Sequence, residues 1–190
     1  MPVHRNLPRL ESGFYKGCVA VHWTFGIEMR AVGWLSEKFH SHFREILLHA
    51  SVRYGFASPV YSLMPDHLHL MLWGIHDGAD LYLAAKFIRK HTAQELLPAL
   101  YQKQAYDHVL LDDECEESAF EKVCFYILEN PVRGGLCEKA SEYRFSGCVV
   151  PGYPDLNIHS KDYWNFYWKA CHRLTAAATK ICSLHFDNEV

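Results

Sequence analysis

The sequence predicts an α+β fold built on a ferredoxin-like split β-α-β-β-α-β sheet, with one extra helix and an irregular C-terminal extension. Three observations predict this fold. Segments with a two-residue apolar period alternate with segments of helical period in that order. A Pro-Asp turn at 65–66 joins two of the β segments into a hairpin. Apolar residues make up 49% of the 190 residues, which is enough for a buried core.

The first half of the chain contains three predicted strands and one helix. CVAVHWTFG (18–26) alternates and is rich in β-forming residues, which indicates a strand. WLSEKFHSHFREILLHASVRYG (34–55) has apolar residues at helical spacing and ends at a glycine. ASPVYSLM (57–64) and HLHLMLWG (67–74) are the two strands of the hairpin.

The second half completes the sheet and adds the extra helix. DLYLAAKFIRKHTAQELL (80–97) is predicted as a helix with Asp80 as its N-cap. AYDHVLL (105–111) is the fourth strand. The extra helix begins at Ser118, which has capping-box spacing to Glu121.

The C-terminal part has a different character. YRFSGCVVPGYPDLN (143–157) contains glycine and proline at turn spacing, which predicts a loop. DYWNFYWKACHRL (162–174) follows as an aromatic-rich helix. We therefore expect one domain over residues 1–150 and an extension over residues 151–190.

The composition favours a cytoplasmic protein. Its seven cysteines are odd in number and form no C-x-x-C motif, which is typical of reduced thiols. The N-terminus has no signal-peptide pattern, and no run of about 18 apolar residues predicts a membrane span. The net charge of −3 argues mildly against an obligate nucleic-acid binder, although local basic patches can still bind phosphates.

The segment MPDHLHLMLWG (64–74) places two histidines in the most apolar run of the chain. Because side chains alternate along a strand, His67 and His69 share one face with Met71 and Trp73, away from the three leucines. Same-face neighbours lie about 6.5–7 Å apart, so the two imidazoles can tilt together and bind one divalent ion. The alternative is a pair of hydrogen-bonded histidines on a half-exposed sheet.

The extra helix offers a third ligand and a nucleophile. YILENPVRGG (126–135) places Tyr126 and Asn130 four residues apart, on one helical face. Asn130 precedes Pro131, so the helix should end or bend there and leave the amide oxygen free to face a metal. Tyr126 then lies one turn away, within reach of a metal-bound phosphate. The alternative is a buried tyrosine and an asparagine that only caps the helix end.

In combination these segments resemble the REP-associated tyrosine transposases, a family of HUH single-strand nucleases. MPDHLHL (64–70) is similar to the family motif M-P-N-H-V-H-L, and YILENPVRGGL (126–136) is similar to Y-I-x-x-N-P-V-R-A-G-L. AYDHVLL and YRFSG resemble the segments before and after the second motif. The resemblance covers roughly residues 15–150. Asp66 and Gly134 depart from the family pattern, which has Asn and Ala there.

The resemblance implies a metal-dependent, single-stranded DNA endonuclease and strand transferase, a transposase that cleaves near DNA hairpins. It implies that Tyr126 is the nucleophile, forming a 5′-phosphotyrosine and freeing a 3′-OH. It also implies that His67, His69 and Asn130 hold Mg²⁺ or Mn²⁺. The expected partners are single-stranded or hairpin DNA with REP-like repeats. The protein is expected to be a monomer or homodimer that associates with the nucleoid and not with a membrane.

Candidate DNA contacts come from basic side chains. Lys86, Arg89 and Lys90 form a positive stripe along one helix, and Arg133 follows the tyrosine motif. A solvated helix face explains the stripe equally well. Arg133 could equally complement the negative end of its helix.

Two further groups of residues have both a functional and a structural interpretation. His22 and His108 could lie near the site, but histidines in such positions more often have a structural role. The aromatic residues of 163–168 could stack on unpaired bases, but they more often cover a core.

Two competing functions remain open at this stage. A catalytically retired relative would bind hairpin DNA without cutting it. An unrelated metal hydrolase would use His67 and His69 and would tolerate the loss of Tyr126. The complete set of two histidines, tyrosine and asparagine favours the transposase.

Overall fold

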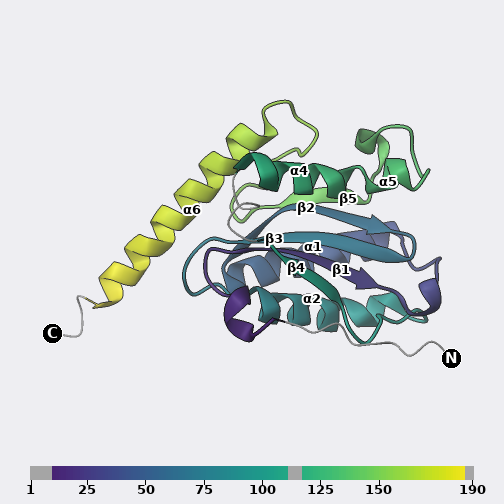
Figure 1. Ribbon diagram of the computed structural model, residues 1–190, viewed down its shortest axis with the longest axis horizontal. Helices are drawn as coiled ribbons and strands as arrows, with labels where there is room; N and C mark the ends of the chain where they lie inside the picture. The colour runs from purple at the N-terminus through teal and green to yellow at the C-terminus, as the bar shows by residue number, and fades with distance from the viewer. Residues whose placement is uncertain (1–9, 111–116, 187–190) are drawn as a thin grey trace.

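The computed structural model describes residues 10–110 and 117–186, in which a five-stranded sheet lies between two helical layers (Figure 1). The sheet has the order β4-β1-β3-β2-β5, and every pair of neighbours is antiparallel. The strands are β1 (Ala20–Gly26), β2 (Phe56–Met64), β3 (His67–Gly74), β4 (Tyr106–Val109) and β5 (Ser146–Val149).

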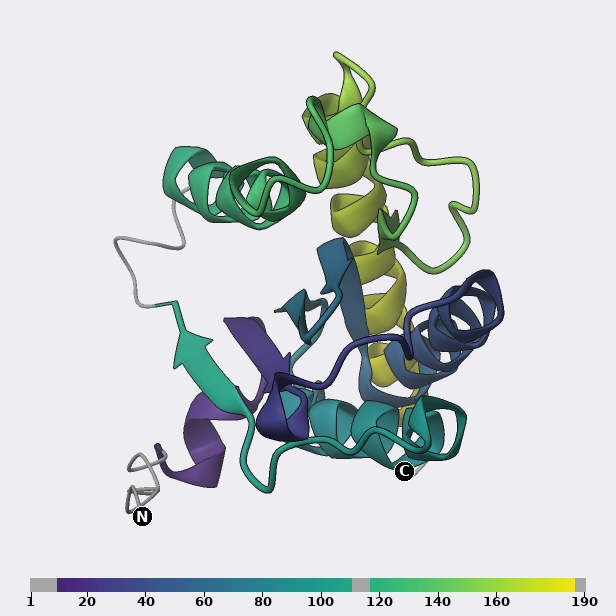
Figure 2. The same cartoon turned by 90° about the vertical axis from the view of Figure 1, so that its right-hand side faces the viewer.

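Helices cover both faces of the sheet (Figure 2). One face is covered by α1 (Glu37–Tyr54) and α2 (Leu81–Leu96). The other is covered by α4 (Glu117–Leu128), the short α5 (Asn130–Arg133) and the first turns of α6 (Tyr163–Phe186). Three 3₁₀ turns complete the described elements: η1 (Ser12–Tyr15), η2 (Glu28–Arg30) and η3 (Ala140–Glu142).

The predicted α+β class and the split β-α-β-β-α-β order are confirmed, but three details of the C-terminal half differ. The segment 143–157, predicted as a loop, contains β5, which adds to the edge of the sheet with Tyr61 opposite Gly147. The aromatic helix runs to Phe186 rather than ending near 174. Ser118 lies inside α4, so it is not the N-cap that its spacing predicted.

Local signals set the ends of the first two helices. The Ser36 side chain accepts a hydrogen bond from the Phe39 N–H at 3.2 Å and caps α1. Gly55 ends α1 in the left-handed region at φ 70°, and a Cβ there would lie 2.1 Å from His76 Nε2. Only glycine satisfies both conditions. Asp80 caps α2 as predicted.

Two hydrophobic cores hold the layers together. Leu68, Leu70 and Leu72 of β3 belong to the larger core under α1 and α2. This confirms the prediction that these leucines lie on the face of the strand opposite the histidines. The second core joins the opposite face of β3 to α4 and α6 through Met71, Phe120 and Tyr167. This second core fixes α4, the helix that carries Tyr126, over the histidine face of the sheet. No helix in residues 10–110 or 117–186 is long and apolar enough to cross a membrane.

Candidate metal and nucleophile site

The two histidines of β3 point their ring nitrogens at each other. His67 Nε2 and His69 Nε2 lie 3.1 Å apart, and the rings are perpendicular with centroids 4.8 Å apart. Metal–imidazole bonds are about 2.0–2.1 Å long, so both nitrogens can reach one cation from these positions. The predicted convergence of the two imidazoles is therefore present in the structure.

A carboxylate on the preceding turn orients His67. Asp66 Oδ1 lies 2.6 Å from His67 Nδ1, and Asp66 Oδ2 lies 2.6 Å from Arg30 Nε. Burial opposes the charge of Asp66, but the hydrogen bonds from His67 and Arg30 outweigh it and lower the pKa of this carboxyl below its usual value. An ionised Asp66 accepts the Nδ1 proton of His67, which leaves the Nε2 lone pair directed at His69.

His69 is oriented by side chains on the neighbouring strand. Its Nδ1 lies 3.1 Å from His22 Nε2 and 3.2 Å from Thr24 Oγ1, and Thr24 is directly opposite His69 in the ladder. His108 in turn lies opposite His22 on β4. Of the two ambiguous histidines, His22 therefore contacts a predicted ligand directly. Burial, followed by the charges of His22, His67 and Arg133, lowers the pKa of His69 to about 3, which keeps this ring neutral near pH 7.

The Asp66 contact predicts a graded effect on metal affinity. Asp66→Ala is expected to weaken Mn²⁺ binding about 10- to 100-fold, because losing an outer partner frees the ring and tautomer of His67. Asp66→Asn should lose much less, since its amide oxygen still accepts the Nδ1 proton. Calorimetric titration with Mn²⁺ measures both, and equal affinities for the Ala variant and the natural protein would contradict the orienting role.

The buried histidines also predict acid sensitivity. Burial and the neighbouring His108 lower the pKa of His22 to about 4. The ordinary value near 6.5 applies in the unfolded chain, so below that pH the unfolded state binds more protons and stability falls. The loss runs from pH 6.5 down to about 4 and is on the order of 3 kcal/mol for His22 alone. Urea unfolding between pH 8 and 4 measures this loss of stability. The variant His22→Gln should lose less stability over this range, while His69 still contributes its own share. Stability of the natural protein that does not change with pH would contradict the prediction.

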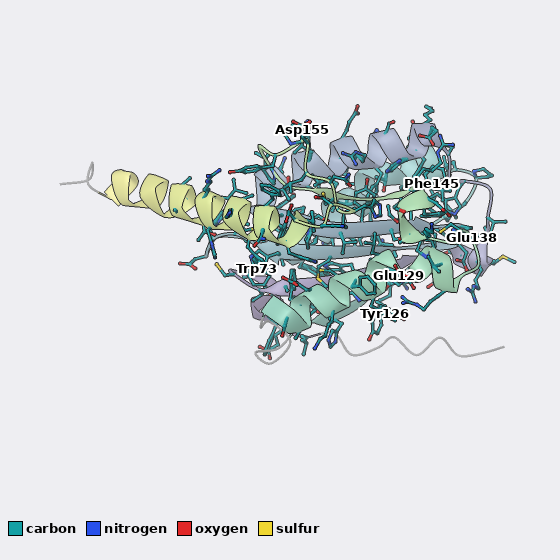
Figure 3. The ribbon with its side chains drawn as sticks, turned by 90° about the horizontal axis from the view of Figure 1, so that it is seen from above. Trp73, Tyr126, Glu129, Glu138, Phe145 and Asp155 are labelled. Atoms are coloured by element: carbon teal, nitrogen blue, oxygen red, sulfur yellow. The ribbon has the colours of Figure 1, made fainter. Side chains whose placement is uncertain are left out.

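The predicted nucleophile lies near the end of α4. Tyr126 is 54% exposed, and Figure 3 shows it on α4 close to Glu129. The Arg133 guanidinium stacks 3.9 Å from the centroid of the Tyr126 ring and also donates to the Tyr126 carbonyl oxygen. Asn130 Nδ2 donates to the carbonyl oxygens of Tyr126 and Ile127, both at 3.2 Å. Because Nδ2 is the donor in both contacts, the amide oxygen Oδ1 is not used in them and can accept a hydrogen bond or bind a cation.

The bend before α5 brings this helix end to the histidine end of the sheet. As predicted from Pro131, α4 stops at Leu128 and a separate short helix follows. A Cβ on Gly134 would lie 3.1 Å from Met64 Cε, and Met64 is directly opposite His67 in the β2–β3 ladder. The charge of Arg133 acts on His69 as well. Tyr126, through Arg133, therefore belongs to the same corner of the molecule as the histidine pair.

The donor set fits a divalent cation only if an amide joins the imidazoles. Within the described parts of the chain, no group of three or more His, Cys, Asp or Glu side chains is placed to hold a metal ion. The imidazoles of His67 and His69 are present with fixed outer partners, and the amide oxygen of Asn130, which is not used in the two hydrogen bonds of its Nδ2, could serve as a third metal ligand. Imidazole and amide donors suit Mn²⁺ and Zn²⁺ better than Mg²⁺, which prefers all-oxygen shells.

The predicted basic stripe is not part of this corner. Lys86, Arg89 and Lys90 lie on α2, which covers the opposite face of the sheet. The Arg89 guanidinium stacks over the rings of Phe25 and Tyr101 and donates to a backbone carbonyl. A role for this stripe in DNA binding stays a prediction, whereas Arg133 contacts the predicted nucleophile.

The aromatic residues of α6 cover a core. Tyr163 and Tyr167 are fully buried against α4 and the sheet, while Trp164 and Trp168 are half-buried. Trp168 Nε1 donates to Glu121 of α4 at 3.0 Å. The structural interpretation of this segment is thus confirmed for its buried members.

Comparison with known proteins supports the fold. No protein-family model matches the chain, and no curated protein is similar to it in sequence. Among solved structures, the chain is similar to a REP-associated tyrosine transposase bound to a REP hairpin, with a TM-score of 0.63. That similarity covers 75% of this chain and 82% of the other chain at 17% sequence identity. At this identity the likeness establishes the shared α+β architecture.

Proposed function

We propose that this protein is a metal-dependent, single-stranded DNA endonuclease and strand transferase that acts near DNA hairpins. The observation that carries the proposal is the meeting of His67 Nε2 and His69 Nε2 at 3.1 Å, with Tyr126 on the helix end at the same corner. The fold shared with a transposase bound to hairpin DNA supports it. The motif resemblance in residues 64–70 and 126–136 points to the same chemistry.

His67, His69 and Asn130 are the residues proposed to hold Mn²⁺ or Mg²⁺. When bound, the ion supplies Lewis-acid polarisation of the scissile phosphate. Asp66 and His22 fix the two rings, so little reorganisation of the protein accompanies binding. The exposed Arg133 adds positive charge beside the nucleophile, where a phosphate would lie.

Tyr126 performs the covalent step in this proposal. Its phenolic oxygen bonds to phosphorus as the bond from phosphorus to the 3′ oxygen breaks. The phenolic proton passes to solvent, which reaches this half-exposed side chain, and the leaving 3′ oxygen acquires a proton. One phosphodiester replaces another, so a second strand's 3′-OH can reverse the step and become joined. Cleavage and strand transfer are therefore one reaction run in two directions.

One observation favours the second candidate, a hairpin-binding protein that no longer cuts. Asn130 Nδ2 is engaged by its own helix, and among the described residues the preformed part of the site consists of the two imidazoles. A site with two ligands binds a cation weakly. If Asn130 does not join them, the same surface can still bind DNA without chemistry.

The test is formation of a covalent adduct. The protein is incubated with single-stranded hairpin oligonucleotides from its own genomic neighbourhood, with Mn²⁺, Mg²⁺ or a chelator, and resolved on a denaturing gel. A shifted band that needs the metal supports the enzyme. Hairpin binding in a native assay without any adduct supports the binding protein. Absence of both binding and adduct contradicts both candidates.

A further inference from the structure

The turn after β1 holds two bulky residues in an unusual backbone conformation. Met29 and Arg30 of η2 both have positive φ, 54° and 53°. Residues with side chains rarely adopt this region, and glycine is the residue that adopts it at no steric cost. The side chain of Met29 is 98% exposed. A strained turn that displays an apolar side chain to solvent is typical of a ligand-contacting segment.

The exposure of Met29 does not come from a loose loop. The Glu28 N–H donates to the Leu100 carbonyl at 2.8 Å, and the Ala31 N–H donates back to Glu28 at 3.1 Å. Arg30 Nε donates to Asp66 at 2.6 Å. The turn is therefore fastened on both sides, and its conformation is imposed by the surrounding structure.

The hydrogen bonds of this turn place Met29 at the rim of the candidate metal site. Arg30 contacts Asp66, and Asp66 contacts His67, so two hydrogen bonds connect the turn to a proposed ligand. The Ile27 N–H also donates to the Asp66 carbonyl, which ties the start of the turn to the same β2–β3 corner. A strand whose phosphate lies at His67 and His69 can therefore place a neighbouring nucleotide against this rim.

We propose that Met29 binds an unpaired nucleobase next to the scissile phosphate; the inference rests on the proposed function. A thioether packs favourably on aromatic faces, and apolar side chains that project from DNA-binding proteins insert beside bases. The next residue, Arg30, pairs with Asp66 but keeps 79% of its side chain exposed, so its guanidinium stays accessible to a backbone phosphate. Because a π-face is common to all bases, this contact holds the strand without reading its sequence.

The experiment pairs the protein variant with a DNA variant. Binding of hairpin oligonucleotides with single-stranded flanks is measured by anisotropy, with a single abasic site moved through each flanking position. Met29→Ala is expected to weaken binding of the intact oligonucleotide about tenfold. One abasic position should cost the natural protein a similar factor and cost Met29→Ala nothing, which is the signature of a shared contact.

Two further variants control for trivial causes. Val52→Ala removes another exposed apolar side chain, on the outer face of α1, and should leave binding unchanged. Met29→Gly should weaken DNA binding as much as Met29→Ala without lowering Tm, since glycine relaxes the turn.

The outcomes separate this inference from the proposed function. Tight binding by the natural protein with an equal response of Met29→Ala at every abasic position overturns only the role of Met29. Failure of the natural protein to bind any of the oligonucleotides overturns the proposed function and this inference together.

Discussion

Tyr126→Phe is expected to eliminate the covalent protein–DNA adduct, lowering its yield at least about 10³-fold, because it removes the oxygen that bonds to phosphorus in the proposed reaction. Hairpin binding should change by less than about twofold, since the ring stays and Arg133 still stacks on it. Within the described residues, none donates to or accepts from the Tyr126 hydroxyl, so the fold loses no hydrogen bond.

The matched control is another exposed tyrosine on the same side of the sheet. Tyr106 is 51% exposed on β4 and lies directly opposite Thr24, which contacts His69. Its position on the histidine face makes it an alternative nucleophile among the described residues. Tyr106→Phe should leave the adduct intact, and an adduct that needs Tyr106 instead of Tyr126 would contradict the assignment.

The measurement combines a denaturing gel with a binding assay on the same oligonucleotides. Loss of the adduct with retained affinity places Tyr126 in the chemical step. Loss of both would instead indicate that the phenol contributes to DNA binding. Retention of both in the variant would exclude Tyr126 as the nucleophile.

The part of the site that follows from strand periodicity could be predicted from the sequence. Alternation along residues 67–74 places His67 and His69 together and opposite the leucines, and the structure has this arrangement. The i to i+4 spacing of Tyr126 and Asn130 likewise predicts their neighbouring positions on one helix. Both patterns depend only on the geometry of a single element.

Contacts between elements could not be predicted in this way. His22 meets His69 because of the register between β1 and β3, and a one-residue shift would have turned it to the other face. Arg30 reaches Asp66 because its turn has a left-handed backbone that no sequence signal indicated. The sequence offers Arg89 for DNA contact, whereas in the structure its guanidinium stacks on Phe25, a tertiary contact that its helical spacing does not indicate.

In the C-terminal half, one element of the fold itself could not be predicted, because it depends on contact with another strand. Strand β5 has only four residues, Ser146–Val149, and it lies among glycine and proline, so its local pattern resembles a loop. Its strand geometry comes from pairing with the exposed edge of β2. The aromatic run of 162–174 did indicate a helix, and its buried members confirm why: they complete the second core.

That second core is the basis of the largest expected effect on stability. Phe120→Ala is expected to lower the free energy of unfolding by about 3–5 kcal/mol, because it leaves a cavity where four aromatic rings meet. Phe120 is fully buried. Its ring lies 5.0 Å from that of Trp73 and 5.5 Å from that of Trp168, with two further rings of α6 beside it.

Phe125→Ala on the same helix is the matched control and should change stability by less than about 0.5 kcal/mol, because its ring is exposed. Urea unfolding measures both variants. Since α4 carries both Phe120 and Tyr126, a loosened core should also displace the tyrosine from the histidine corner. At low temperature, where part of the Phe120→Ala protein is still folded, we therefore expect each folded molecule to form less adduct than a folded molecule of the natural protein. A normal adduct yield per folded molecule would show that α5 and its contact with Met64 hold the helix end without the aromatic core.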